Sequence, residues 1–185
     1  GNAVHFFERD CSIQRRNQKI IEEAPAFDIP QEKLDEIRKI AVNTCKKLNY
    51  KGLGTFEFLY EDGNFYFIEM NTRLQVEHTI TEMITGIDLV KLQIMIAAGQ
   101  EIPLSQDDIN CRGHAIECRI NAEHHETFIP SPGKVTEFHP PGGFRIRTDS
   151  HLYSGYTVPQ YYDALIAKIC AHSSDRISAI RKMRV

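Results

Sequence analysis

The chain has 185 residues, of which 42% are hydrophobic, and this length allows about 70% of the unfolded surface to be buried in one or two cores. Charged residues make up 25% and the formal net charge is −3, so no long-range attraction to nucleic acid or anionic lipid is expected. The sequence has neither an apolar run of about 18 residues nor a basic segment followed by an apolar one. It therefore predicts no membrane span and no secretory signal.

The first 50 residues are expected to form a short strand, a connector and then a helix. Residues 3–8 (AVHFFE) suit a strand, and residues 9–19 (RDCSIQRRNQK) are polar and strongly basic, which predicts a connector. After a break containing proline, residues 31–50 place apolar side chains at helical spacing: Leu34, Ile37, Ala41, Cys45 and Leu48.

Residues 54–71 contain two aromatic-rich runs around Glu-Asp-Gly-Asn, which is a strong hairpin signal. A two-residue Asp-Gly turn would set Glu57 opposite Ile68, with Glu57 and Glu69 on opposite faces. A three-residue Asp-Gly-Asn loop would set Glu57 opposite Glu69, with both on one face. The residues alone leave both registers open.

The remaining segments indicate helices and then strands. Residues 79–86 suit a short helix, and residues 88–99 suit a longer one with an N-cap aspartate and a terminal glycine. Residues 102–108 (IPLSQDD) form a polar break and a candidate boundary. Beyond it, residues 111–123 alternate cleanly as a strand, and residues 131–150 add strands separated by Pro and Gly. A last helix is expected to begin at a Ser-Ser-Asp cap.

The five cysteines are odd in number and form no CxxC pair, which favours free thiols in a reducing cytoplasm over a disulfide frame or a zinc site. Both ends of the sequence resemble interruptions, because a strand starts without a lead-in and the last helix lacks a stop signal. The chain is therefore expected to be part of a larger protein.

Strand alternation points Glu69 and Asn71 to the same face, and the second hairpin register adds Glu57. Two carboxylates and an amide oxygen are hard ligands of the kind that bind Mg²⁺ together with nucleotide phosphates. A solvated strand face explains the same spacing equally well. In the following loop, Arg73 offers a bidentate anion donor and Glu77 a potential general base, although each also suits an ordinary surface position.

The basic segment admits two interpretations, a solvated loop or a cradle for an anion. Its cations are Arg9, Arg15, Arg16 and Lys19, and acids are nearly absent between Asp10 and Glu22. Pairing of the arginines with the acidic residues 22 and 23 is the simpler interpretation.

Three long segments of the chain closely resemble biotin carboxylases, the ATP-grasp enzymes of biotin-dependent carboxylation. They are FERDCSIQRRNQKIIEEAPA (7–26), GTFEFLYEDGNFYFIEMNTRLQVEHTITEMITGIDLV (54–90) and GHAIECRINAE (113–123). Residues 129–168 are similar to the C-terminal region of the family, so the resemblance covers essentially the whole chain. It implies an α+β fold, in which an antiparallel sheet flanked by helices (the ATP-grasp C-terminal lobe) continues into the mainly β biotin carboxylase C-terminal domain. The domains would span residues 1–104 and 105–185.

The resemblance implies the ligands of a nucleotide and its metal ions. Glu57 and Glu69 would hold Mg²⁺ or Mn²⁺ on the ATP phosphates, with Asn71 completing a second metal position, which favours the three-residue loop. Gln14 and Asn17 would lie near the nucleotide, although many family members have His in place of Asn17.

The resemblance also implies roles in binding and activating bicarbonate. Lys19, Arg73 and the backbone at Gln75 and Val76 would bind bicarbonate, and Glu77 would deprotonate it for attack on the γ-phosphate of ATP. Carboxyphosphate would then release CO₂ beside biotin on its carrier protein. Arg119 would stabilise the biotin enolate, a charge that develops only during the reaction.

The implied partners are a biotin carboxyl carrier protein or domain, a carboxyltransferase and a second copy of the chain, with no nucleic acid or membrane. The cytoplasm is the expected location, or the mitochondrial matrix in a eukaryote. Acetyl-CoA carboxylase in fatty acid synthesis is the favoured context, with pyruvate, propionyl-CoA and methylcrotonyl-CoA carboxylases as alternatives. Carbamoyl-phosphate synthetase is disfavoured by Arg119. Because no glycine-rich lid is found, the isolated chain is expected to be inactive, and a folding or dimerisation module is the non-enzymatic alternative.

Overall fold

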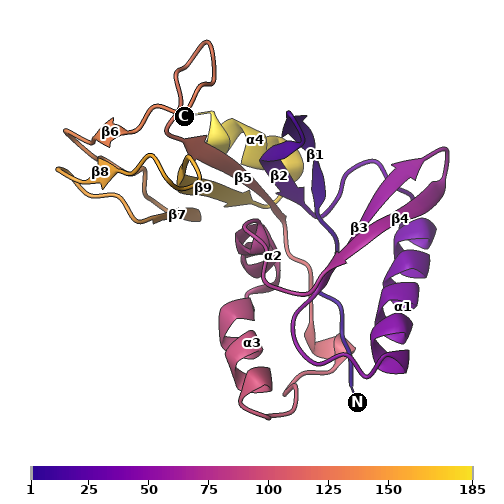
Figure 1. The fold of residues 1–185 in the computed structure, drawn as a ribbon. Helices are drawn as coiled ribbons and strands as arrows, with labels where there is room; N and C mark the ends of the chain where they lie inside the picture. The colour runs from indigo at the N-terminus through magenta and orange to yellow at the C-terminus, as the bar shows by residue number, and fades with distance from the viewer. Residues whose placement is uncertain (1, 185) are drawn as a thin grey trace. The chain divides into compact units, whose positions relative to one another are not determined.

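A computed structural model describes residues 2–184, which form two compact units (Figure 1). The first unit contains the residues up to Asp10 and Ala24–Arg112, and the second contains Cys11–Glu23 and the residues from Gly113 onward. Residues 11–23 therefore belong with strands that follow much later in the sequence. The α+β architecture agrees with the expectation, and the domain division after residue 104 stays a prediction.

The helices lie close to their predicted positions, and their caps follow from the sequence. The first unit contains α1 (Gln31–Lys47), α2 (His78–Thr85), α3 (Leu89–Ala97) and the short 3₁₀ helix η1 (Gln106–Asp108), and the second contains α4 (Arg176–Met183). Asp88 caps α3 by accepting the Lys91 N–H at 2.7 Å, and Asp175 caps α4 by accepting the Ser178 N–H at 2.9 Å. No helix within residues 2–184 is long and apolar enough to cross a membrane.

Apolar residues of α1, α2 and α3, together with the residue after η1, form the buried core of the first unit. Its buried side chains include Leu34, Ile80, Ile84, Leu89, Leu92 and Ile109. Leu48 departs from the predicted apolar stripe and is 66% exposed, because α1 ends one residue earlier.

The hairpin of the first unit closes with the shorter of the two possible turns. Strands β3 (Thr55–Glu61) and β4 (Asn64–Asn71) are joined by Asp62 and Gly63, with φ values of 49° and 76°. Two successive positive φ angles match a type I′ turn, which glycine and aspartate tolerate. The three-residue loop favoured by the family resemblance is therefore wrong.

A β-bulge in β4 nevertheless produces the register that this loop was meant to explain. Phe58 pairs with Phe67, whereas Glu57 pairs with Glu69, so Ile68 is the extra residue. An inserted residue reverses the side-chain alternation beyond it, which brings the two glutamates to one face. The predicted pairing of Glu57 with Glu69 is thus confirmed, through a different device.

The second unit is built on a sheet with the strand order β1-β2-β5-β9-β7. These strands are β1 (Asp10–Arg15), β2 (Gln18–Ala24), β5 (His114–Asn121), β7 (Ile146–Ser150) and β9 (Leu165–Ser173), and a separate pair comprises β6 (Gly133–Lys134) and β8 (Thr157–Val158). Strand β9 is antiparallel to both β5 and β7, and α4 packs against β5 and β9 (Figure 1). The expectation of a mainly β second half is confirmed.

The N-terminal segment corrects two predictions. Residues 3–8 are not a strand, and the supposed basic connector is the hairpin formed by β1 and β2. Arg16 and Asn17 form its turn, with φ values of 51° and 61°. Asn is tolerated there, but the missing glycine hid the turn signal, and the polar side chains of these strands do not alternate as clearly as those of β5.

Gly113 allows β5 to begin close to the neighbouring strand. Its φ is +71°, and a Cβ at this position would overlap the carbonyl oxygen of Ser173. A residue with a side chain would therefore be both strained and sterically blocked here.

Candidate active site

The hairpin of the first unit brings three predicted metal ligands together. The amide nitrogen of Asn71 donates to Glu57 Oε1 at 3.1 Å and to Glu69 Oε1 at 2.8 Å. One amide NH₂ group therefore bridges two carboxylates from adjacent strands. This is the arrangement expected where two negative oxygens converge on a position suited to positive charge.

These oxygens fit a divalent hard cation. Two carboxylates and an amide, whose oxygen would face the ion if the group turned over, form a set that Mg²⁺ or Mn²⁺ accepts together with phosphate oxygens and water. Within residues 2–184 no group of three His, Cys, Asp or Glu side chains gathers for a metal ion. A complete coordination shell would therefore need ligands such as nucleotide phosphates.

The loop after β4 positions the residues predicted to bind and deprotonate bicarbonate. Arg73 is exposed and donates to the Leu74 carbonyl at 3.1 Å, while Gln75 is 7% exposed. The side-chain nitrogen of Gln75 donates to Glu57 Oε1 at 2.6 Å. Since this side chain is engaged within the unit, the backbone is the part of Gln75 suited to a ligand.

Glu77 is the residue before α2 and is only 2% exposed. Val76 precedes it and is half-buried. His78 begins the helix, with its Nδ1 lying 2.9 Å from the Gln75 carbonyl oxygen, so it helps to fix the loop. The Glu77 carboxylate is therefore shielded from bulk water and is not an ordinary surface residue.

In the second unit, the predicted nucleotide and bicarbonate residues lie on the β1–β2 hairpin. Gln14 is exposed and donates to the Cys11 carbonyl at 3.0 Å, Asn17 occupies the exposed turn, and Lys19 is half-buried on β2. Gln14, Asn17 and Lys19 thus share one hydrogen-bonded hairpin, where the sequence had predicted a polar, basic connector.

Arg119 lies on β5, where a buried carboxylate holds its guanidinium. Its Nε donates to Glu22 Oε1 at 2.6 Å, and its Nη2 lies 2.5 Å from the same oxygen. Glu22 is fully buried, whereas the Arg119 side chain is 16% exposed. The buried Glu22 thus orients the guanidinium of Arg119, which still reaches the surface of the unit.

A second buried carboxylate lies on the same strand as Arg119. Glu117 is fully buried on β5, and Cys170 Sγ lies 3.5 Å from its Oε2. Burial, reinforced by the charges of Glu22 and Glu117, raises the pKa of the Cys118 thiol. Cys118 is therefore a neutral thiol near pH 7 rather than a nucleophile.

Two functional features were missed by the sequence analysis. Glu22 was interpreted only as a partner for arginines of its own segment, and Arg9 only as part of a basic connector. Alternating burial along β2 leaves a pattern in QKIIEEA from which Glu22 could have been found. Arg9 leaves none, because its contacts are all distant in sequence.

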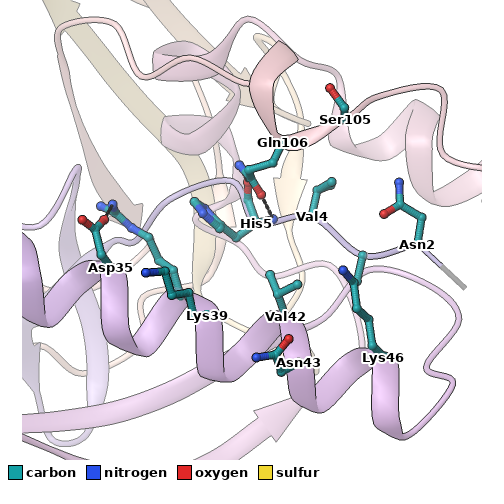
Figure 2. A pocket seen from close by; sticks show the side chains of 12 residues that line it. Asn2, Val4, His5, Asp35, Lys39, Val42, Asn43, Lys46, Ser105 and Gln106 are labelled. Carbon is teal, nitrogen blue, oxygen red and sulfur yellow. Dashed lines mark hydrogen bonds and ion pairs between the residues drawn. The ribbon is translucent and has the colours of Figure 1, made fainter.

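A pocket of about 410 Å³ in the first unit lies elsewhere (Figure 2). It is lined by residues near the N-terminus, by α1 and by η1 with the residue before it, including His5, Arg38, Lys39, Lys46 and Gln106. None of the predicted site residues contributes to it. The candidate site is therefore defined by converging polar groups and not by this pocket.

Two protein families match the chain. Residues 1–105 match the ATP binding domain of the carbamoyl-phosphate synthase L chain, and residues 117–185 match the biotin carboxylase C-terminal domain. The chain therefore consists of parts of two successive domains, one similar to this ATP binding domain and one similar to the biotin carboxylase C-terminal domain.

The biotin carboxylase of Allochromatium vinosum is 61% identical over 99% of this chain, and a pyruvate carboxylase subunit of Methanothermobacter thermautotrophicus is 51% identical over all of it. The chain covers 41% and 38% of these relatives. A solved structure of the biotin carboxylase domain of the 2-oxoglutarate carboxylase from Hydrogenobacter thermophilus, with MgADP, ADP and bicarbonate, is 48% identical. It matches 99% of this chain and 41% of that chain with a TM-score of 0.96. The chain belongs to the biotin carboxylase family.

Proposed function

We propose that the protein containing this chain is a biotin carboxylase, which uses ATP and bicarbonate to carboxylate biotin on a carrier protein. The observation that carries the proposal is the convergence of Glu57, Glu69 and Asn71 on one face of the β3–β4 hairpin. The family match, together with a related domain solved with MgADP and bicarbonate, supports this assignment.

In the proposed reaction, Glu57, Glu69 and Asn71 bind Mg²⁺ or Mn²⁺, which supplies charge neutralisation at the ATP phosphates. Gln14 and Asn17 contact the nucleotide. These side chains contribute only positioning and electrostatic stabilisation, which are the main protein contributions to phosphoryl transfer.

Lys19, Arg73 and the backbone of Gln75 and Val76 bind bicarbonate. The buried carboxylate of Glu77 takes the bicarbonate proton as an oxygen attacks the γ-phosphate, and the bond to ADP breaks. Carboxyphosphate forms and breaks down to CO₂ and inorganic phosphate beside biotin. The ureido nitrogen of biotin loses its proton to this phosphate and forms the bond to CO₂. Arg119, held by Glu22, stabilises the negative charge that develops on the ureido oxygen of biotin.

The physiological context is proposed to be acetyl-CoA carboxylase in fatty acid synthesis, in the cytoplasm, with a carrier protein, a carboxyltransferase and a second copy of the chain as partners. The similarity to a biotin carboxylase exceeds that to a pyruvate carboxylase subunit, which favours this choice. A pyruvate carboxylase is the second candidate because the Methanothermobacter thermautotrophicus protein still matches the whole chain at 51% identity.

Two substitutions in the full-length protein test the metal and biotin roles. Glu69→Gln is expected to raise the metal concentration needed for bicarbonate-dependent ADP release by roughly tenfold or more, because it removes a charged ligand. Glu61→Gln, an exposed carboxylate of the same hairpin, is the matched control and should leave this requirement unchanged. Equal metal requirements for both variants would contradict the metal role.

Arg119→Lys keeps the positive charge beside Glu22 and replaces the planar guanidinium by an ammonium group. Biotin carboxylation is expected to fall by roughly 10²-fold, while bicarbonate-dependent ATP cleavage falls much less. Arg181→Lys, at an exposed position of α4, provides the control. An equal loss of both activities in Arg119→Lys would remove its assignment to biotin.

A further inference from the structure

Arg9 connects three separate segments of the first unit. Its Nη1 donates to Thr81 Oγ1 at 2.9 Å, and its Nη2 donates to Gln75 Oε1 at 2.8 Å and to Thr55 Oγ1 at 3.3 Å. Thr81 lies in α2 and is 2% exposed, Gln75 lies in the loop before α2, and Thr55 begins β3. The guanidinium therefore ties the loop and the helix to the strand that bears Glu57.

The chemistry of Arg9 fixes the orientation of the Gln75 amide. Arginine only donates hydrogen bonds, so the oxygen of Gln75 must face it. The amide nitrogen is then directed to Glu57, to which it donates at 2.6 Å. Without Arg9, the amide could turn over and present its oxygen to the carboxylate, which would repel it.

A neutral amide between Arg9 and Glu57 has a different effect from a direct ion pair. A guanidinium bound to the carboxylate would orient it but would also compete with a metal ion for its charge. An amide transmits the orientation and leaves the charge in place. The second amide donor to Glu57 Oε1, from Asn71, acts in the same way.

We infer that Arg9 is a positioning residue for Glu57 and acts through the side-chain amide of Gln75. The inference rests on the proposed function of Glu57 as a metal ligand. The hydrogen bonds of the Arg9 guanidinium run to Thr81, Thr55 and Gln75, so Arg9 sets the plane of the Glu57 carboxylate through Gln75.

The test is the affinity of the full-length protein for Mn²⁺, measured by electron paramagnetic resonance with a non-hydrolysable ATP analogue. Arg9→Met keeps most of the side-chain stem and removes the donors. The dissociation constant for Mn²⁺ is expected to rise roughly tenfold, as for other residues that orient metal ligands. Arg9→Lys is expected to recover part of this loss, because one ammonium group can still donate to Gln75 but cannot reproduce the fork.

Arg38→Met controls for a general loss of stability. Arg38 is also a partly buried arginine of the first unit, and its hydrogen bonds run to Glu8 and Asp35. This variant should lower the melting temperature and leave the Mn²⁺ affinity within about twofold of the parent value. If it weakens Mn²⁺ binding as much as Arg9→Met does, the inference is overturned.

A double-mutant cycle tests the path through Gln75. Gln75→Leu should itself weaken Mn²⁺ binding, and adding Arg9→Met to it should change the affinity by no more than about twofold. Fully additive effects would show that Arg9 acts without Gln75 and would overturn the inference.

Glu57→Gln separates this inference from the proposed function. If Glu57→Gln weakens Mn²⁺ binding and Arg9→Met does not, only the role of Arg9 is refuted. If Glu57→Gln has no effect, the proposed metal site itself is wrong and the role of Arg9 falls with it.

Discussion

The carboxylates of the β3–β4 hairpin and Glu22 of the second unit are held by different kinds of donor. In the β3–β4 hairpin, Glu57 and Glu69 share the amide of Asn71, whereas in the second unit Glu22 binds the guanidinium of Arg119. An amide orients a carboxylate without cancelling its charge, while a guanidinium orients and neutralises it. The hairpin is thus suited to receive a cation from outside, and the sheet to hold a cation that the protein supplies.

Burial explains why the hairpin carboxylates and Glu22 have different donors. Glu69 is exposed to water, which solvates its charge, so hydrogen bonds from an amide suffice. Glu22 is fully buried, and an isolated ion there would cost several kcal/mol without a charged partner. A glutamate is therefore suited to bind a metal ion where it is exposed, and to hold an arginine of the protein where it is buried.

The largest loss of stability is expected when the ion pair between Glu22 and Arg119 is broken. Glu22→Ala leaves Arg119 without its carboxylate and should destabilise β2 and β5 by about 3 kcal/mol, the lower end of the range for a broken buried pair because Arg119 reaches water. Amide hydrogen exchange of these strands in the full-length protein measures the local opening free energy.

Glu57→Gln is the corresponding change in the hairpin and should alter the exchange of β3 and β4 by less than about 1 kcal/mol, because an amide oxygen can still accept its hydrogen bonds. Equal destabilisation by the two substitutions would show that the carboxylates do not differ in the way described.

The side of the strand that each residue occupies was largely predictable, but its partners were not. Alternation in residues 111–123 was sufficient to place Arg119 on β5, and cap residues located α3 and α4. Local patterns determine strands and helices. Whether Arg119 meets Glu22 depends on which strands become neighbours, which no local signal records.

The β3–β4 hairpin shows a second limit of prediction from sequence, which concerns strand register. Turn chemistry allowed the type I′ turn at Asp62 and Gly63 but did not distinguish it from a three-residue loop, which was preferred because the functional register required Glu57 opposite Glu69. The bulge at Ile68 satisfies both demands. Bulges have weak sequence signals, because a single unpaired residue changes the register without needing a special side chain.

An intermediate loss of stability is expected from placing a negative charge at Asn71, whose amide bridges Glu57 and Glu69. Asn71→Asp removes the donor shared by Glu57 and Glu69 and places a third negative group between them, which should destabilise the hairpin by about 1–2 kcal/mol without metal. Saturating Mn²⁺ should reverse the loss, as measured by hydrogen exchange of β3 and β4. Asn43→Asp, at an exposed position of α1, is the control, and a loss in Asn71→Asp that Mn²⁺ leaves unchanged would contradict cation binding at this bridge.

The smallest effect concerns Glu23, which also has charged partners but lies nearer to water. Burial favours its neutral form, yet hydrogen bonds from His114 Nε2 at 2.6 Å and from Arg176 Nε at 2.6 Å outweigh this and lower the pKa to about 2 from an ordinary value of 4.5. The folded state therefore binds fewer protons than the unfolded state between these values. The resulting stability is fully present above pH 4.5 and is lost as the pH falls toward 2.

Glu23→Gln removes this titration. The difference in urea midpoint between the parent protein and the variant should be constant above about pH 5 and should shrink steadily as the pH is lowered toward about 3. Arg176 is 32% exposed, so water screens the pair and keeps the difference smaller than that of Glu22→Ala. A difference that stays constant from about pH 5 to about pH 3 would mean that Glu23 is held by shape alone, and that neutralisation by charged partners is confined to the fully buried Glu22.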